Sequence, residues 1–396
     1  MDAYDARKRL YVIVAAMAAC LLSFAISNCR KNRTDRDRSE QAAATRPASG
    51  LGDKLESIPR CLIFSCASDA SGAVAIDDGA LLVADDENNV LRAYRTNAGS
   101  PIFEVDLSAF LELEGDRPEV DIEAAARIGN RVYWISSHGR NRNGKWRPNR
   151  CRFFATDISS DGDRTVVRPA GRFYAKLAER IMDDPGVRAA CPGLPASFHS
   201  GKLPAGAREF TAPKQRGLNI EGLCANADGD RLYIGLRNPL SAGRSIVIPL
   251  LNPSEIIDEA KSPKFGRPML WDLDSRGIRD MVHSARHGAT FILAGPKGDT
   301  GHFALYRWSG KIDRQPVFVR KLNFGKPTWR PEALVAIPNS SELLILSDDG
   351  VMLIPVNGPE DCIKPEYHRY DGTCLNKHLR EEARKYFRGT TISPTR

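Results

Sequence analysis

The chain has 396 residues, of which 42% are hydrophobic and 27% are charged, and it contains 32 glycines and 25 prolines. These proportions are typical of a soluble globular protein with many turns, and the length indicates two domains or one repetitive architecture. The net charge of +8 is spread along the chain, and no nucleic-acid-binding motif accompanies it. We therefore expect no nucleic-acid partner.

Residues 10–26 form an apolar run of seventeen residues without a charge, and three basic residues precede it at 7–9. This pattern is typical of a signal peptide or of an N-terminal membrane anchor. Ala25 and Ser27 suit cleavage, whereas seventeen residues are at the short end of the roughly 17 to 25 that span a membrane. We therefore expect 1–29 to be either one. The protein would be extracytoplasmic: periplasmic, secreted, or anchored in the inner membrane, which is then a partner.

The next segment, 30–57, is rich in arginine, alanine and serine and has little apolar sequence, so we predict a disordered linker. Its basic residues complicate export, because positive charge favours the cytoplasmic side of a membrane, and an inverted topology stays open. Folded sequence is expected at 58–360. The tail, 361–396, has leucine and aromatic residues at helical spacing over 375–387, which predicts a C-terminal helix.

One pattern recurs five times between residues 71 and 355: an apolar strand, a short turn, a second apolar strand that ends in small polar residues, and then further strands. The turns at 78–79, 129–130, 228–230 and 287–288 contain glycine, aspartate or asparagine and suit short hairpins. Four strands in each repeat are typical of a propeller blade. We therefore predict an all-β protein, a β-propeller with five four-stranded blades.

The longest gap separates the second and third repeats. Within it, 173–190 carries apolar residues at helical spacing, so we predict a helical insertion over about 173–214. Six blades are the alternative if this insertion folds as β-structure. The apolar run at 61–66 precedes the first repeat and is expected to complete the last blade, because ring closure removes exposed strand edges.

Acidic and amide side chains form a column when the first strands are aligned. In a propeller these strands line the central channel, and side chains two apart face the same way. Converging oxygen atoms suit a hard cation such as calcium, or general acid/base work. The alternative is that neighbouring arginines, such as Arg279 and Arg330, pair with the carboxylates and lock the blades together. Ser71 interrupts the column, whose candidate ligand or metal residues are Asp121, Glu123, Asn219, Glu221, Asp280 and Glu332.

The ends of the second strands are expected near one rim, where they would surround the mouth of a pocket for a small-molecule or protein ligand. His138 is either a general base or a hydrogen-bonded loop residue. The basic run at 138–150 suits a phosphate or an anionic glycan, or is a solvated hairpin loop. The candidate rim residues are Asp85, Asp86, His138, Arg237 and Asp348.

Eight of the nine cysteines follow Cys20, an even number that is compatible with pairing outside the cytoplasm. The predicted pairs are Cys362 with Cys374, which closes a short loop, and Cys151 with Cys191, which brackets the insertion. The alternative is that these cysteines are buried thiols, as we expect for Cys224.

Several motifs occur in order: DIEAAA at 121–126, SSHGRN at 136–141, GLNIEGL at 217–223, GLRNPL at 235–240, and then RGIRDM, LYRWSG, PEAL and SDDG. With these motifs the chain resembles the bacterial domain-of-unknown-function family three-six-one-six over roughly 71–355. More distantly, it is similar to the esterase-like phytase propellers. The resemblance implies a propeller, usually exported, without an assigned activity. The dense aspartate clusters of a multi-calcium phytase are missing.

Familiar enzyme signatures are missing as well, namely GxSxG, HExxH, CxxC, GxGxxG and the Walker loop, which disfavours serine hydrolase, zinc protease, redox and nucleotide functions. Two hypotheses follow. The first is an extracytoplasmic binding or scaffold module for an unknown ligand. The second is a metal-assisted phosphoesterase or esterase with a central carboxylate site, for which calcium is the candidate cofactor. The sequence leaves open whether the protein is an enzyme.

Overall fold

A computed structural model of the chain describes residues 60–115, 118–203, 213, 216–298, 300–324 and 329–395. The chain divides into two units, Met1–Glu56 and Ser57–Arg396, and all described residues belong to the second. The predicted signal peptide or anchor and the predicted linker lie outside the described residues. Within the described ranges, no helix has the length and apolar composition that a membrane span requires.

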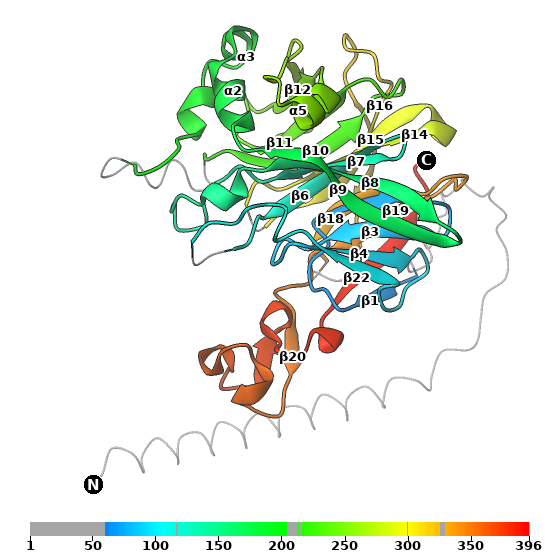
Figure 1. The fold of residues 1–396 in the computed structure, drawn as a ribbon. Helices are drawn as coiled ribbons and strands as arrows, with labels where there is room; N and C mark the ends of the chain where they lie inside the picture. Colours follow the sequence, from blue (N-terminus) through cyan, green and yellow to red (C-terminus); the bar gives the residue numbers. More distant parts are fainter. Residues whose placement is uncertain are drawn as a thin grey trace, which may run out of the picture. The chain divides into compact units, whose positions relative to one another are not determined.

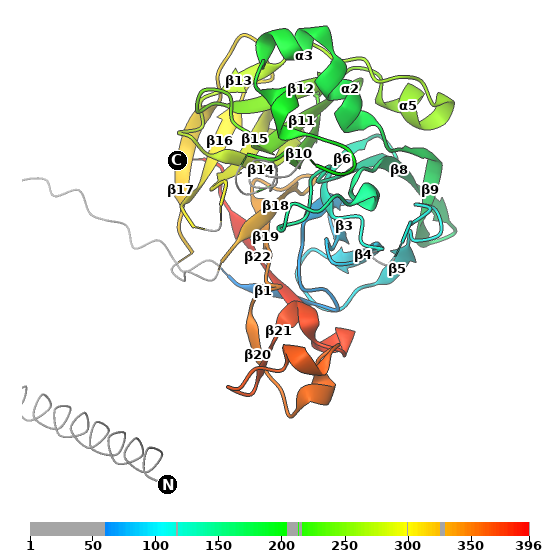
Figure 2. The ribbon, with the colours of Figure 1, turned by 90° about the vertical axis from the view of Figure 1, so that its left-hand side faces the viewer.

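Five antiparallel four-stranded sheets surround a shared centre, as the view in Figure 2 shows. Blade 1 consists of β2 (Gly72–Ala75), β3 (Ala80–Ala84), β4 (Val90–Arg95) and β5 (Phe103–Asp106). Blade 2 consists of β6 (Ile122–Ile128), β7 (Arg131–Ser136), β8 (Phe153–Asp161) and β9 (Arg164–Tyr174). Blade 3 consists of β10 (Asn219–Ala225), β11 (Leu232–Asn238), β12 (Ser245–Leu250) and β13 (Met269–Trp271). Blade 4 consists of β14 (Gly277–Ser284), β15 (Ala289–Gly295), β16 (Phe303–Trp308) and β17 (Val317–Leu322). Blade 5 consists of β18 (Pro331–Ala336), β19 (Leu343–Ser347), β22 (Tyr386–Ile392) and β1 (Leu62–Ser65). The prediction of a five-bladed, all-β propeller is confirmed.

The hydrophobic core lies between successive blades. Strands β11 and β15 are buried at every residue, because each blade packs its two faces against its neighbours. Between blades 3 and 4, the ring of Trp308 lies 5.1 Å from that of Tyr233 and 5.0 Å from that of Trp271, measured between centroids. Large aromatic side chains of this kind stabilise the contact between sheets.

The fifth blade is built from both ends of the chain. As predicted, the run at 61–66 closes it, because β1 is its outermost strand and pairs with β22, which pairs with β19. The C-terminal helix predicted over 375–387 is wrong. These residues contain 3₁₀ turns, and then β22 begins at Tyr386. A short helix is marginal by itself, whereas β22 satisfies the open edge of β19 and stacks Phe387 on Phe64, with centroids 4.9 Å apart.

The predicted helical insertion between blades 2 and 3 is present as α2 (Leu177–Asp183) and α3 (Pro185–Ala190). Leu177, Ile181 and Val187 of these helices are buried in the core that blades 2 and 3 share. A third helix, α5 (Pro253–Glu259), follows β12. The described part of the insertion is therefore helical and adds no sixth blade. The 3₁₀ helices are η1 (Pro148–Arg150), η2 (Leu194–Ser197), η3 (Ala285–His287), η4 (Pro359–Asp361), η5 (Pro365–Tyr367), η6 (Asn376–His378) and η7 (Glu382–Arg384).

A small lobe, residues 353–385, projects from the ring between β19 and β22, as Figure 1 shows. It contains a two-stranded sheet of β20 (Leu353–Pro355) and β21 (Thr373–Leu375). We call it the C-terminal lobe. The predicted disulfide between Cys362 and Cys374 is present, and Leu379 packs against it.

The second predicted disulfide is wrong, because Cys151 and Cys191 are free thiols. Both are buried in one apolar cluster, where a thiol serves as a small hydrophobic side chain. Cys224 is also a free, buried thiol, as predicted, and burial raises its pKa to about 12. Cysteine number alone does not determine connectivity.

Candidate functional site

The first strands of blades 2 to 5 each contain a β-bulge at one residue that lines the central cavity. The ladder is interrupted on both sides of Glu123, Glu221, Arg279 and Glu332. A bulged residue is left out of the strand pairing and its side chain is redirected. All four side chains line the same cavity. The bulges therefore build one ring of charged groups from four blades.

In blade 4 the predicted column of acidic residues is wrong by one residue. Arg279, and not Asp280, occupies the position equivalent to the glutamates. The buried carboxylate of Asp280 accepts hydrogen bonds from the backbone N–H groups of Met281 and Leu334, both at 2.7 Å. Asp280 does not line the cavity and instead connects blade 4 to blade 5. Burial raises its pKa well above the usual range.

A second ring lies two residues before the bulges. Asp121, Asn219 and Arg330 occupy it in blades 2, 3 and 5, and all three line the cavity. In blade 1, Ser71 uses its hydroxyl to donate to the carbonyl oxygen of Ile122, and Asp69 takes the position two residues earlier. The sequence reasoning missed Asp69, although its spacing from Ser71 is that of Asp121 from Glu123.

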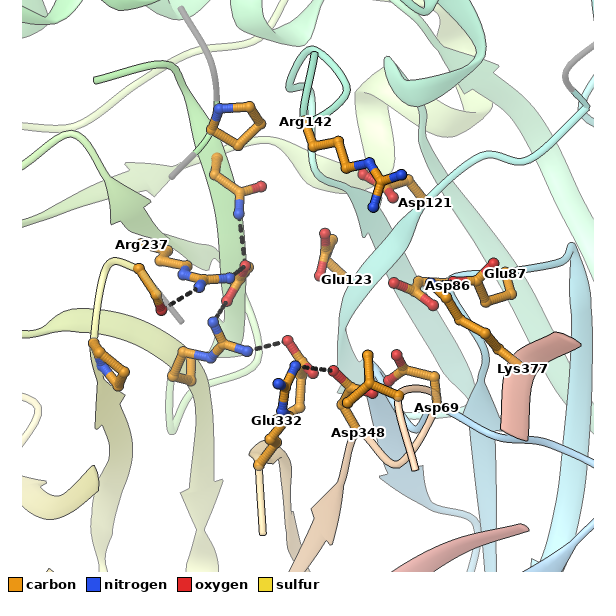
Figure 3. A pocket seen from close by; sticks show the side chains of 18 of the residues that line it. Asp69, Asp86, Glu87, Asp121, Glu123, Arg142, Arg237, Glu332, Asp348 and Lys377 are labelled. Carbon is orange, nitrogen blue, oxygen red and sulfur yellow. Dashed lines mark hydrogen bonds and ion pairs between the residues drawn. The ribbon is translucent and has the colours of Figure 1, made fainter. Parts of the chain in front are cut away.

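The cavity has a volume of about 1310 Å³ and receives side chains from all five blades and from the C-terminal lobe. Three of the predicted rim residues, Asp86, Arg237 and Asp348, line it (Figure 3). Asp85 does not, because its buried carboxylate accepts hydrogen bonds from the N–H groups of Ser68 and Glu87, at 3.2 and 2.9 Å.

His138 lies outside the cavity lining, so the structure does not place it as a general base there. The side chain is fully buried, and its Nδ1 lies 2.8 Å from the carbonyl oxygen of Ser136. Burial lowers the pKa of His138 to about 4, which favours the neutral imidazole. It is a hydrogen-bonded loop residue, the second of the two predicted interpretations.

On the side of blades 3 to 5, the carboxylates are paired with arginines. Glu221 lies 2.6 Å from Arg237 Nη1 and 3.0 Å from Arg279 Nη1. Arg279 also contacts Glu332, and Arg330 lies 3.8 Å from Asp348. This half of the cavity matches the predicted alternative in which arginines lock the blades together. We call it the paired half.

On the side of blades 1 and 2, three carboxylates face the cavity without a partner. Figure 3 draws Glu123, Asp69 and Asp86 with no interaction to the residues around them. Glu123 forms no hydrogen bond or ion pair with any described residue, and one buried carboxylate oxygen of Asp69 and one of Asp86 have no donor there. Glu123 is 8% exposed and Asp69 is 5% exposed. We call these three residues the unpaired carboxylates.

Burial is the main cause of a raised pKa at each unpaired carboxylate. For Glu123, the nearby charges of Glu221 and Asp121 raise the pKa further. Burial and the neighbouring carboxylates likewise hold the pKa values of Asp69 and Asp86 well above their usual range. The protonated form is therefore favoured at all three, and a positive charge placed among them would favour the ionised form.

Other acids near this half already have a cation. Arg150 lies 2.9 Å from Asp121 and 2.6 Å from Glu119. Lys377, which the C-terminal lobe contributes, pairs with Glu87. The sequence analysis placed Arg150 in the basic run at 138–150, but not as the partner of Asp121 and Glu119. It missed Lys377, because the C-terminal lobe contacts this side of the ring only in the folded protein.

Two groups of three carboxylates are close enough to hold a metal ion, with ligand oxygens that lie within 4.8 Å of one another. They are Asp69 with Glu332 and Asp348, and Glu123 with Glu221 and Glu332. Two members of each group already form ion pairs with arginine, so each group offers one carboxylate without a counter-charge. Calcium requires about 6 to 8 oxygen ligands, so neither group completes a calcium shell.

Comparison with solved structures finds similar chains at low identity. Glutaminyl cyclase from Myxococcus xanthus is 11% identical, with 73% of this chain and 90% of that chain covered and a TM-score of 0.38. A putative glucose dehydrogenase from Thermus thermophilus is 14% identical, with 84% and 100% covered and a TM-score of 0.39. Aldose sugar dehydrogenase from Streptomyces coelicolor is 11% identical, with 84% and 100% covered and a TM-score of 0.37. These similarities support no inference about function.

No curated protein sequence matches the chain. A family model described as "Protein of unknown function (DUF3616)" matches residues 69–157 and 209–350. The matched ranges contain both rings of cavity residues and the second strands that end beside them. More than half of the chain is covered, so the chain belongs to the DUF3616 family.

Proposed function

We propose that the protein is a binding module whose central cavity takes a ligand with a positively charged group. The observation that carries the proposal is the set of unpaired carboxylates, Asp69, Asp86 and Glu123, which line the cavity and form no ion pair with a described residue. The cation near Asp86, Lys377, forms its ion pair with Glu87 instead. An ionised carboxylate that is buried without a partner is strongly unfavourable. A cation at about 4 Å would contribute about 4 kcal/mol of Coulomb energy at an effective dielectric constant of about 20.

The size of the cavity favours an organic ligand over a single ion. Its volume is about 1310 Å³, whereas pockets for small organic molecules occupy roughly 300 to 1,000 Å³. The paired half gives the cavity a rigid wall, because Glu221 is held by two arginines at once. The unpaired carboxylates therefore face a space that a cationic molecule can enter.

We also propose that this module acts outside the cytoplasm. The apolar segment at 10–26 supports export or anchoring, and the disulfide between Cys362 and Cys374 is typical of an oxidising compartment. If the N-terminal segment is retained, the inner membrane is a partner of the chain.

A metal-assisted phosphoesterase or esterase is the second candidate. The two carboxylate groups with oxygens within 4.8 Å of one another support it. In each group two of the three carboxylates already pair with arginine, so a metal ion would compete with these ion pairs for its ligands. The binding module requires no such competition, and we therefore favour it.

Affinity measurements on wild type and two variants test both candidates. The probes are 6-aminohexanol, as a simple organic ammonium, and calcium chloride, measured by titration calorimetry at pH 8, where fewer protons compete for the carboxylates. We expect 6-aminohexanol to bind, and we expect Glu123→Gln to weaken it about tenfold or more, since a buried charge pair contributes about 1.5 to 3 kcal/mol. Glu342→Gln, at an exposed position of the β18–β19 turn, is the matched control.

Binding of calcium with no binding of the amine would favour the metal-assisted hydrolase. Absence of both interactions, or an amine affinity that Glu123→Gln leaves unchanged, would contradict the proposed cationic site. Because the proton competes with the ligand at carboxyls of raised pKa, the affinity for the amine should rise between pH 6 and pH 8.

A further inference from the structure

The mouth of the cavity carries a second, oppositely charged feature. Residues 141–147 lie between β7 and β8, and we call them the basic loop. Arg142, Lys145 and Arg147 of this loop line the cavity, and Arg142 extends into it in Figure 3. None of the three forms an ion pair with another described residue. They are thus cations at the mouth without a counter-charge.

The remaining cations of the cavity are already neutralised. Arg150, which follows the loop, pairs with Asp121 and Glu119 at 2.9 and 2.6 Å. Arg237 and Arg279 face Glu221. The three basic-loop side chains therefore differ from every other cation that lines the described cavity, because no carboxylate accepts from them.

The basic loop is held in a defined conformation. The side-chain oxygen of Asn141 accepts hydrogen bonds from the N–H groups of Asn143 and Lys145, at 3.0 and 2.9 Å. Gly144 permits the tight turn with φ of 68°. The loop backbone is therefore ordered before a ligand binds. Little backbone entropy is lost when the three basic side chains bind a ligand.

The buried side chain of Arg140 stabilises the conformation of the basic loop. Arg140 is 5% exposed and donates to the carbonyl oxygen of Gly144 at 3.2 Å. It also donates to the carbonyl oxygens of His199 and Gly201, both at 2.7 Å, and its guanidinium lies 5.5 Å from the ring centroid of Trp146. Arg140 therefore connects the basic loop to the segment that follows the helical insertion's described helices.

We propose that the ligand also carries an anionic group, a phosphate or a carboxylate, which the basic loop binds while the cationic group lies at the unpaired carboxylates. This inference rests on the proposed function, because it assigns the second charge of the same ligand. A molecule with both charges matches a cavity with free carboxylates inside and free cations at the mouth.

A set of six-carbon probes separates the two subsites. They are 6-aminohexanol, with the ammonium alone; hexyl phosphate, with the phosphate alone; and 6-aminohexyl phosphate and 6-aminohexanoate, with both charges. The flexible chain adapts to the distance between the subsites. We expect 6-aminohexyl phosphate to bind wild type about tenfold or more tightly than 6-aminohexanol, because the basic loop can donate charge-assisted hydrogen bonds to the phosphate. Comparison with 6-aminohexanoate distinguishes phosphate from carboxylate.

The variant removes the loop charges together, as Arg142→Gln/Lys145→Gln/Arg147→Gln. It should abolish the advantage of 6-aminohexyl phosphate and change the affinity for 6-aminohexanol less than about threefold. The matched control removes three exposed charges from β9, outside the cavity, and should retain the full advantage. Its substitutions are Arg164→Gln, Arg168→Gln and Arg172→Gln.

The outcomes distinguish failure of this inference from failure of the proposed function. If 6-aminohexanol binds and neither doubly charged probe binds more tightly, the basic loop is not an anion subsite and the inference is overturned. An equal loss in the β9 control would also overturn it, because the effect would then be one of net charge. If only hexyl phosphate binds and the loop variant abolishes that binding, the result supports the anion subsite and contradicts the cationic site. If no probe binds, both proposals fail.

Discussion

Replacement of Glu221 and of Glu123 by glutamine should change the stability of the propeller in opposite directions. Both glutamates are bulged residues of equivalent strands and are almost fully buried. They differ in their partners. Glu221 lies 2.6 Å from Arg237 and 3.0 Å from Arg279, whereas Glu123 forms no ion pair with a described residue.

Glu221→Gln leaves two buried guanidinium groups without their shared counter-charge. Removal of one partner of a buried ion pair costs about 3 to 5 kcal/mol. Glutamine retains an acceptor for one N–H group, and Arg279 keeps Glu332, so the lower end of this range applies. We expect the free energy of unfolding to fall by about 3 kcal/mol at pH 7.

Glu123→Gln removes no partner and removes an ionisable group that burial disfavours. Because the pKa of Glu123 is raised in the folded protein, the folded state binds its proton more tightly than the unfolded chain does. The wild type therefore loses free energy of unfolding as the pH rises above the unfolded pKa, and the variant is spared this loss. We expect the variant to be more stable than wild type by about 1 kcal/mol or more at pH 8, with a smaller difference at pH 5.

Urea unfolding followed by tryptophan fluorescence measures both effects, with Glu342→Gln as the exposed control. If Glu123→Gln destabilises the protein as much as Glu221→Gln does, Glu123 has a stabilising partner and the division of the cavity into a paired and an unpaired half is refuted. If Glu221→Gln is neutral, the arginine lock does not stabilise the blades.

Two further predictions concern the carboxylate at blade 5 and the closing strand. Burial raises the pKa of Glu332 from 4.5 to about 7, although the charge of Arg279 acts in the opposite direction. The free energy of unfolding that Glu332 contributes should therefore fall by about 3 kcal/mol at most as the pH rises from 4.5 to 7. Glu332→Gln should flatten the measured pH profile between pH 5 and 7; an unchanged slope would show that another group is responsible. Termination of the chain after Lys385 removes β22 and should abolish the cooperative unfolding transition in near-ultraviolet circular dichroism, whereas termination after Ile392 should preserve it. A cooperative transition in the shorter chain would contradict the closure of blade 5 by β22.

The repeated hairpins and the helical insertion were predictable from the sequence because their signals are local. Turn residues and short apolar strands identify each blade, and apolar spacing identifies α2. The same patterns located Glu123, Glu221 and Glu332, since the residues around them recur from blade to blade.

The departures from prediction have physical causes that are not local. The aligned column contained Asp280 in place of Arg279, because a strand pattern read from the sequence does not fix the register to within one residue; the structure shows that Arg279 is the bulged residue of β14. The tail at 375–387 has helical spacing, but an unpaired strand edge outweighs a weak helical preference. Lys377 enters the site from a lobe that follows the last repeat, so no column of aligned repeats could contain it.

The pairing of strands in blade 5 also determines which part of the propeller would bear a pulling force applied to the N-terminal segment. β1 is the first strand of the described chain and the outermost strand of the closing blade, where four residues pair with β22. If the N-terminal segment anchors the protein in a membrane, tension on that tether pulls on β1. Antiparallel pairs that are pulled from one end separate one after another, so the force would peel β1 from β22 and expose the ring of Phe64. The joint that closes the propeller would then be the first to yield under tension.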